Sequence, residues 1–288
     1  MKELVNDETT LVSAADLAAA LGDGMLRIVD ARFALSDPGA GRAGYAQSHL
    51  PGAVYADLNQ DLSDLGKRGV GRHPLPDDTA FADKLGEWGI GPEHRVVVYD
   101  AGDGSMAAAR LWWMLKLLGH SHVAVLDGGL AAWREQGLPE TDATSEFPSV
   151  PSYPAHFNGH RIATADEVRE RLDEDSGWLF DARAAERFRG EVEPIDPVAG
   201  HIPGAINRPY AENLENGRFK PSEKLREELI PMLAGRDPSD TVLMCGSGVT
   251  ACHLLLAFEH AGLHGAKIYA GSWSGWISDP TRPIAQGD

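Results

Sequence analysis

IVDAR at residues 28–32 and HLPGA at residues 49–53 return later in the chain as LFDAR at residues 179–183 and HIPGA at residues 201–205. The two motifs follow one another in the same order in both halves. The repeating unit takes up about half of the chain and is far longer than the ~20–50 residues of a solenoid repeat. The sequence therefore predicts a duplicated domain.

The two copies differ at a position that carries chemistry. RVVVYD at residues 95–100 aligns with TVLMC at residues 241–245, so Asp100 occupies the position of Cys245. A carboxylate at that position cannot act as a sulfur nucleophile. We therefore expect a non-catalytic first copy and a reactive second copy.

Both copies alternate short apolar stretches, typical of buried strands, with helical stretches. This alternation predicts an α/β fold of two tandem domains, each a mostly parallel sheet flanked by helices. We place the first domain at residues 1–140 and the second at residues 161–288. Residues 141–160 are rich in proline and lack periodicity, which is typical of a linker.

The composition limits the partners that this protein can have. Its 288 residues suit two domains of about 150 residues each. With a net charge of −17 and no basic stripe, nucleic acid is not an expected partner. No segment has the length of a membrane span or the pattern of a signal peptide. Two cysteines without zinc-site spacing suit a reducing compartment, so we expect a cytoplasmic protein that uses no metal.

The loop CGSGVT at residues 245–250 is the candidate reactive site. Gly246 and Gly248 permit backbone conformations in which several N–H groups turn toward one point at the start of a helix. Such a nest and the helix dipole stabilise a thiolate or a persulfide on Cys245. Cys252 falls within an apolar helical run and is expected to be buried and inert.

CGSGVT, the paired DAR and HIPGA motifs and YAGSWSGW at residues 269–276 resemble the tandem-domain rhodanese family over nearly the whole chain. The resemblance implies an inactive N-terminal domain, a catalytic C-terminal domain and sulfur transfer through a persulfide. The loop is similar to that of 3-mercaptopyruvate sulfurtransferases. Rhodaneses that prefer thiosulfate more often carry an Arg-Lys pair after the cysteine.

The chemistry implied by this resemblance is nucleophilic catalysis in two steps. The Cys245 thiolate takes sulfur from a small anionic donor, and the persulfide passes it to cyanide, a thiol or a thioredoxin-like protein. No cofactor is required. Mercaptopyruvate is the expected donor because Gly246 and Ser247 carry no charge, whereas thiosulfate remains the alternative.

The resemblance assigns the donor site to the second copy. Arg187, the first arginine of RFRG, would bind the donor carboxylate, and Arg189 is a second candidate; the first copy has no such motif. Guanidinium geometry suits a bidentate contact with a carboxylate. The remaining loop residues would line the substrate site: Gly246, Gly248, Val249 and Thr250.

The resemblance also implies a proton relay. Ser247 would contact the donor ketone or the departing enolate, assisted by His73 in GRHPLP and by Asp57 in HLPGAVYADL. A relay of this kind would supply a proton to the enolate. The structural alternatives are an exposed loop histidine for His73 and a turn-capping carboxylate for Asp57.

One position departs from the mercaptopyruvate pattern. A second substrate arginine is expected shortly after Arg187, where this chain has Asp196. A carboxylate there is expected to repel an anionic donor. Arg183 and Arg208 are possible substitutes, although Arg32 matches Arg183 in the first copy, which favours a structural role for that pair.

Two other functions compete with sulfur transfer on this fold. Cysteine phosphatases on the same fold need an arginine where this chain has Ala251. A non-catalytic binding module would explain Asp100, but would leave CGSGVT and RFRG without a use. Sulfur transfer is therefore the favoured prediction.

Overall fold

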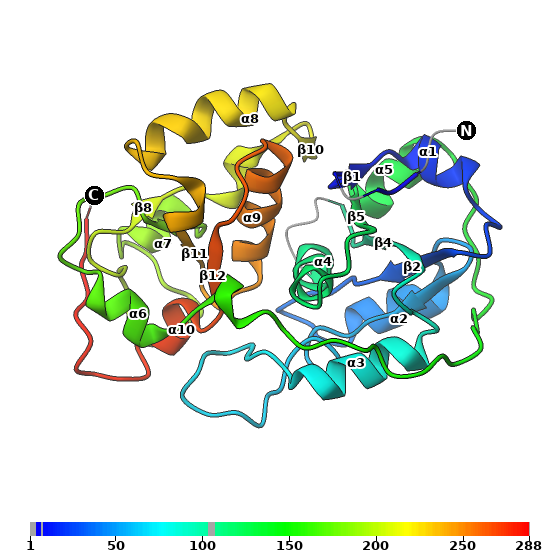
Figure 1. Cartoon of the computed structure of the whole chain (residues 1–288), viewed down its shortest axis with the longest axis horizontal. Helices are drawn as coiled ribbons and strands as arrows, with labels where there is room; N and C mark the ends of the chain where they lie inside the picture. The colour runs from blue at the N-terminus through cyan, green and yellow to red at the C-terminus, as the bar shows by residue number, and fades with distance from the viewer. Residues whose placement is uncertain (1–3, 7, 103–106, 288) are drawn as a thin grey trace. The chain divides into compact units, whose positions relative to one another are not determined.

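The computed structural model describes residues 4–6, 8–102 and 107–287 (Figure 1). The chain forms two compact units. The first unit consists of Met1–Asp64 and Leu75–Asn158, and the second of Leu65–Pro74 and Gly159–Asp288. The second unit thus includes a ten-residue segment from the first half of the sequence.

Within the described residues, the first unit contains a five-stranded parallel sheet of order β1-β5-β4-β2-β3. Helices follow the strands along the chain (Figure 1). The strands are β1 Leu11–Val12, β2 Leu26–Asp30, β3 Ala53–Tyr55, β4 Arg95–Tyr99 and β5 Val123–Leu126. The helices are α1 Ala14–Ala19, α2 Ala40–Gln47, α3 Asp78–Glu87, α4 Ala107–Leu117 and α5 Gly129–Glu135.

The described part of the second unit repeats this arrangement, with a five-stranded parallel sheet of order β6-β12-β11-β7-β8. Its strands are β6 Ile162–Ala163, β7 Leu179–Asp181, β8 Ile206–Asn207, β11 Val242–Met244 and β12 Lys267–Tyr269, and an antiparallel pair is formed by β9 Leu214–Glu215 and β10 Arg218–Phe219. The α-helices are α6 Ala165–Glu170, α7 Ala185–Phe188, α8 Ser222–Leu229, α9 Thr250–His260 and α10 Ser272–Trp276. Short 3-10 helices span Gly159–Arg161, Tyr210–Asn213, Ile230–Leu233 and Pro238–Asp240.

The apolar pattern of the strands explains why each sheet is covered on both faces. In β4, Val97 and Tyr99 pack into a cluster with α1 and α5, so the alternating Val96 and Val98 face the other side, where α4 contacts β4 and β5. All four side chains are buried. Two buried faces are characteristic of a parallel sheet between helices, and the predicted α/β fold is confirmed.

The DAR motifs form the same internal network in both copies. Arg32 donates to both carboxylate oxygens of Asp30 and to the carbonyl of Ser48. Arg183 donates in the same way to Asp181 and to the carbonyl of Gly200. These contacts tie each β-strand end to the residue before its HxPGA motif, which confirms the structural role that the repeat predicted.

The histidines of the HxPGA motifs are also structural. His49 stacks on Tyr45, with ring centroids 3.9 Å apart, and its Nδ1 lies 2.7 Å from the carbonyl of that residue. His201 stacks on Phe188 at 3.8 Å, and its Nδ1 lies 2.8 Å from the Phe188 carbonyl. Each ring therefore ties its motif to the helix that precedes it in the chain.

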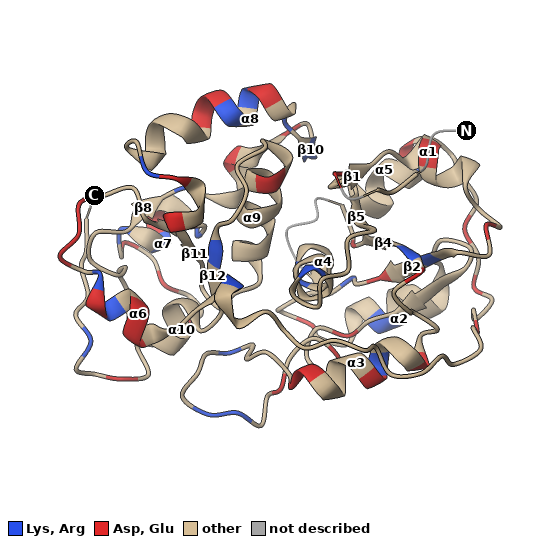
Figure 2. Ribbon diagram, in the orientation of Figure 1, with Lys and Arg blue, Asp and Glu red and all other residues tan. Residues whose placement is uncertain are grey.

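Charged residues of both signs are interspersed along the chain (Figure 2). Helices α3 and α8, for example, carry basic and acidic side chains on the same helix, with none of the single-sign basic stripe that phosphate binding requires. In the part of the chain that the structure describes, no helix combines the length and apolar character needed to cross a membrane. No cluster of metal-ligating side chains occurs there either.

Candidate active site

Cys245 follows the end of β11, and its backbone is tied to the start of α10. The Cys245 carbonyl accepts a hydrogen bond from the Trp273 N–H at 3.0 Å, and the Gly246 carbonyl accepts one from the Ser274 N–H at 2.9 Å. The Cys245 N–H donates to Ser272 Oγ at 3.1 Å. These bonds hold the loop at the carboxyl edge of the sheet, where α/β folds place ligands.

The first unit makes the same backbone contacts around Asp100. The Leu130 N–H donates to the Asp100 carbonyl at 2.9 Å, and the Ala131 N–H donates to the Ala101 carbonyl at 3.1 Å. Asp100 is buried at the end of β4, as Cys245 is at the end of β11. The alignment of Asp100 with Cys245 is therefore confirmed in three dimensions.

Cys245 is almost fully buried, and its sulfur accepts a hydrogen bond from the backbone. The residue is 2% exposed, and the Gly248 N–H donates to its Sγ at 3.2 Å. Gly248 has φ +78°, and a Cβ at this position would lie 2.4 Å from the Ala270 carbonyl oxygen. Glycine is thus required for the turn that directs this N–H toward the sulfur and leads into α9.

Cys252 has a different environment, in the first turn of α9. It is fully buried, and its thiol donates to the Gly248 carbonyl at 3.2 Å. This geometry agrees with the expected structural role of Cys252.

Ser247 lies beside a histidine from the first half of the sequence. His73 Nδ1 is 2.9 Å from Ser247 Oγ, and both residues are buried. His73 belongs to Leu65–Pro74, the segment that packs with the second unit. In that segment Gly71 has φ +110°, and a Cβ on it would lie 2.7 Å from the Gly271 carbonyl oxygen, so only glycine allows this close approach.

Arg187 projects from α7 into a cluster of carboxylates. Its Nη2 donates to Glu193 at 2.7 Å and to Asp196 Oδ2 at 3.2 Å, and its Nε donates to Glu193 at 3.2 Å. A Cβ on Gly246 would lie 3.5 Å from Arg187 Nη1. The guanidinium therefore lies beside the residue that follows Cys245.

Glu193 is the buried partner that orients this guanidinium. Burial raises the pKa of its carboxyl, but the hydrogen bonds from Arg187 and from the backbone N–H groups of Asp196 and Ile195 outweigh burial and hold the pKa below its usual range. Glu193 is therefore ionised at neutral pH and keeps Arg187 in one orientation.

Comparison with known proteins agrees with this architecture. A model of the rhodanese-like domain matches residues 13–136 and again residues 164–279. The chain belongs to the rhodanese family. Both rhodanese domains were expected from the repeated motifs, and both are present.

Several relatives share the whole tandem arrangement. The chain is 48% identical to a probable 3-mercaptopyruvate sulfurtransferase of Pseudomonas aeruginosa, covering 96% of this chain and 98% of that protein. It is 40% identical to the putative thiosulfate sulfurtransferase SseB of Mycobacterium tuberculosis, covering 96% and 97%. The crystal structure of the 3-mercaptopyruvate sulfotransferase SseA from Escherichia coli matches with a TM-score of 0.78 at 33% identity, covering 92% and 99%.

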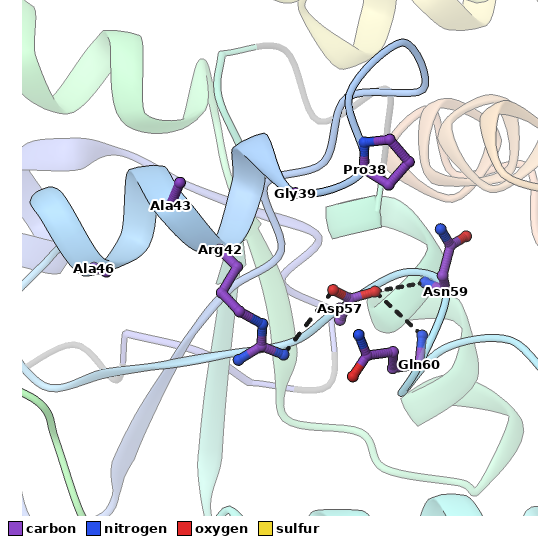
Figure 3. Close-up of a pocket in the computed structure, with 8 residues that line it drawn as sticks. All are labelled: Pro38, Gly39, Arg42, Ala43, Ala46, Asp57, Asn59 and Gln60. Atoms are coloured by element: carbon purple, nitrogen blue, oxygen red, sulfur yellow. Dashed lines mark hydrogen bonds and ion pairs between the residues drawn. The ribbon is translucent and has the colours of Figure 1, made fainter.

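Asp57 lies in the first rhodanese domain, where it caps a turn (Figure 3). Its carboxylate accepts hydrogen bonds from the N–H groups of Asn59 at 2.9 Å and Gln60 at 3.2 Å, and lies 4.0 Å from Arg42. These four residues help to line a pocket of about 480 Å³. The relay role of Asp57 remains a prediction.

Three other predicted substrate residues, Arg189, Val249 and Thr250, lie in the second rhodanese domain. Arg189 pairs with the exposed carboxylate of Glu191 at 2.8 and 3.0 Å, so its role in substrate binding also remains a prediction. Val249 is buried and precedes Thr250, the first residue of α9. The loop N–H groups of these two residues thus belong to the N-terminus of a helix.

Arg72 is a residue that the motifs did not single out. It pairs with Asp196, and a Cβ on Gly246 would lie 3.0 Å from its Nη2. Its only sequence signal is its position immediately before His73 in GRHPLP. The two substitutes considered for the second arginine have other partners: Arg183 binds Asp181, and Arg208 binds Asn213 and Glu228.

Proposed function

We propose that this protein is a sulfurtransferase that takes sulfur from 3-mercaptopyruvate and carries it as a persulfide on Cys245. The observation that carries the proposal is the buried sulfur of Cys245, which accepts a hydrogen bond from Gly248 N–H at the entrance to α9. The 48% identity to a probable 3-mercaptopyruvate sulfurtransferase over nearly the whole chain supports the choice of donor.

In the first step, the Cys245 thiolate attacks the donor sulfur. The S–S bond forms as the carbon–sulfur bond of mercaptopyruvate breaks, and the electron pair leaves on carbon as the pyruvate enolate. Protonation of the enolate then gives pyruvate. The Gly248 N–H, which donates to Cys245 Sγ, would stabilise the anionic sulfur before the attack and the persulfide after it.

Ser247 and His73 supply the hydrogen-bonding group that the enolate needs. The Ser247 hydroxyl can donate to the developing enolate oxygen, and His73 Nδ1, 2.9 Å away, orients the hydroxyl. Asp57 is proposed as the third member of this relay. Its capping geometry leaves one carboxylate oxygen, Oδ2, toward Arg42 rather than toward the turn N–H groups.

Arg187 is proposed to bind the donor carboxylate. Its Nη2 and Nε are engaged by Glu193 and Asp196, and both Nη atoms lie near Gly246, beside the nucleophile. An oriented guanidinium places a carboxylate more accurately than a mobile one, because less side-chain entropy is lost on binding.

In the second step, an acceptor thiol attacks the outer sulfur of the persulfide and regenerates the Cys245 thiolate. Because Cys245 is 2% exposed, the acceptor must present a slender sulfur group, such as a small thiol or the cysteine of a thioredoxin-like protein. A thiol acceptor suits the reducing cytoplasm, where we expect the protein to work.

The test is intact-protein mass spectrometry after brief exposure to 3-mercaptopyruvate or, separately, to thiosulfate. We expect one added sulfur atom with both donors and faster loading by mercaptopyruvate. Thiosulfate is the second candidate donor, because one close relative carries the name of a thiosulfate sulfurtransferase. Faster loading by thiosulfate would make thiosulfate the preferred donor instead of 3-mercaptopyruvate. Loading by neither compound would overturn the sulfurtransferase assignment.

A further inference from the structure

The second copy carries a loop that the first copy lacks. In the first copy, His49 stacks on Tyr45 and follows it by only 4 positions. In the second copy, His201 stacks on Phe188 in the same way, but follows it by 13 positions. The additional residues form a loop at positions 190–200 that contains neither helix nor strand. This 190–200 loop is therefore an insertion specific to the copy with the cysteine.

The 190–200 loop carries the two carboxylates that hold Arg187. Glu193 and Asp196 accept hydrogen bonds from its guanidinium at 2.7 and 3.2 Å, and both side chains are almost fully buried. The N–H groups of Ile195 and Asp196 donate to Glu193 at 3.1 and 3.0 Å. Because α7 is only 4 residues long, it gives Arg187 little support of its own. The direction of this guanidinium thus depends on the conformation of the loop.

A segment from much later in the chain, residues 282–287, fixes the end of the loop. We call it the closing segment. Ala285 and His201 form an antiparallel bridge in which each N–H donates to the carbonyl of the other residue at 2.9 Å. Gly200 has φ +120°, and a Cβ on it would lie 2.3 Å from the Ala285 carbonyl oxygen. Only glycine allows the closing segment to pass so near the loop.

The closing segment also fixes the start of the loop. The Gly287 N–H donates to the Arg189 carbonyl at 3.0 Å. A Cβ on Gly190 would lie 3.1 Å from Gln286 Cγ and 3.2 Å from the Gly200 N atom. The two ends of the loop therefore lie side by side, both in contact with the same short segment.

The first copy shows which part of this arrangement belongs to the fold alone. Thr141 and His49 form the same antiparallel bridge, again with two hydrogen bonds of 2.9 Å. Trp133 and Trp276 each donate an indole N–H to the carbonyl of a proline shortly before the bridge. The bridge is thus common to both copies. In the second copy alone it also closes a loop that carries buried carboxylates.

We propose that the closing segment positions Arg187 for the sulfur donor by fixing both ends of the 190–200 loop. Its residues do not contact the donor. They act through the loop and through the carboxylates of Glu193 and Asp196. Closure of a loop before a ligand binds reduces the conformational entropy that is lost on binding. This inference rests on the proposed sulfur transfer, in which Arg187 binds the donor carboxylate.

The decisive experiment compares Ala285→Pro with the matched control Thr141→Pro. Each variant removes the N–H that donates to the histidine carbonyl of its own copy. Ala285→Pro should raise the KM for 3-mercaptopyruvate by about 5- to 10-fold with a much smaller change in kcat, the equivalent of about one hydrogen bond. Thr141→Pro should lower the melting temperature and leave KM unchanged. A wild-type KM in a folded Ala285→Pro variant would contradict the proposal.

Hydrogen exchange shows whether the loop itself is affected. In Ala285→Pro we expect faster exchange of the N–H groups of Ile195 and Asp196, because their bonds to Glu193 depend on the closed loop. In Thr141→Pro the same groups should exchange at the wild-type rate. Faster exchange without a rise in KM would mean that the closing segment stabilises the loop but does not position the donor, and would overturn the inference.

Gln286→Ala covers the case in which Ala285→Pro does not fold. It keeps the backbone of the closing segment and removes only side-chain contacts: the hydrogen bond of 3.3 Å to the Ala199 carbonyl and the packing against Gly190. We expect KM to rise by about 2- to 3-fold, at the lower end of what one hydrogen bond contributes. Gln136→Ala removes an exposed glutamine of the first unit and should leave KM unchanged. Equal KM values in the two variants would contradict the proposal.

Alkylation of Cys245 by iodoacetamide separates this inference from the proposed function. The reagent is neutral and has no carboxylate, so Ala285→Pro and the wild type should react at the same rate. A slower reaction of the variant would mean that the cysteine loop itself is disturbed, which would contradict an effect on donor positioning alone. Failure of the wild type to take up sulfur from any donor would instead reject sulfur transfer, whatever the closing segment does.

Discussion

His73 Nδ1 lies 2.9 Å from Ser247 Oγ, although the two residues are 174 positions apart in the sequence. The contact is possible because the ten-residue segment Leu65–Pro74 packs against the loop around Gly271, where Gly71 and Gly275 allow close backbone approach. A hydroxyl in the nucleophile loop thereby acquires a fixed partner. The same segment brings Arg72 next to Gly246.

Removal of either partner of this hydrogen bond should slow the reaction of mercaptopyruvate selectively. For Ser247→Ala and His73→Gln we expect kcat to fall by about 10²-fold, because the enolate loses an oriented donor. Loading by thiosulfate should change much less, since sulfite leaves without needing a proton. Stopped-flow loading with the two donors measures the difference, and the exposed His264→Gln serves as the control. Equal losses with both donors would contradict a role in proton supply.

The two cysteines should differ completely in function. Cys245→Ser removes the nucleophile and should abolish loading by every donor. Cys252→Ser keeps a small hydrogen donor for the Gly248 carbonyl and should retain loading. Intact-protein mass spectrometry of both variants after exposure to a donor checks this assignment. An equal loss of sulfur loading in the two variants would refute it.

Ser272 combines an unfavourable backbone conformation with a useful side chain. It has φ +51°, where the first copy has Gly129 at φ +54°, and its Oγ accepts the Cys245 N–H. Ser272→Ala keeps the strain and leaves that N–H buried without an acceptor, which should cost about 1–3 kcal/mol. Ser272→Gly loses the same bond but relieves about 1 kcal/mol of strain, so it should be the more stable variant. Thermal unfolding of both variants gives the order of their stabilities. A more stable alanine variant would show that backbone strain at residue 272 is unimportant.

The Asp196 carboxylate should set the preference between donors. Asp196→Asn leaves Arg72 and Arg187 with one negative charge fewer between them. We expect the ratio of thiosulfate loading to mercaptopyruvate loading to rise by about tenfold, because the dianion gains more from the added net charge. Competition between the two donors, read by mass spectrometry, measures the ratio. If the ratio of thiosulfate to mercaptopyruvate loading stays constant or falls in Asp196→Asn, the Asp196 carboxylate does not offset the positive charge of the two arginines.

Burial lowers the pKa of His120 in the first unit to about 4. Its ordinary value in an unfolded chain is about 6.5, so the folded state keeps the ring neutral while the unfolded state takes up a proton. This contribution to stability is complete above pH 6.5 and is lost as the pH falls toward 4, by up to about 3 kcal/mol. His120→Phe should make denaturant unfolding of the first unit less dependent on pH in this window. An unchanged pH dependence would show that other groups control it.

The repeated motifs predicted the fold, and local patterns account for the environment of several candidate site residues. Cys245, Gly248 and the inert role of Cys252 follow from local patterns: a β-strand end, a small-residue turn and an apolar helix. Arg187 is a candidate because RFRG occurs in one copy and not in the other. Arg72 and the orienting role of Glu193 were missed, since neither belongs to a repeated or periodic pattern.

The sequence by itself determined the duplicated α/β fold, the alignment of Asp100 with Cys245 and the chemistry expected of that thiol. These features depend on periodicity and on neighbouring residues, which can be read along one dimension. Only the tertiary structure decided that Asp196 is a bridge between Arg72 and Arg187 rather than an unpaired charge beside the nucleophile loop. The physical reason is that the effect of a charge depends on what surrounds it, and the partner of Asp196 comes from 124 positions earlier in the chain.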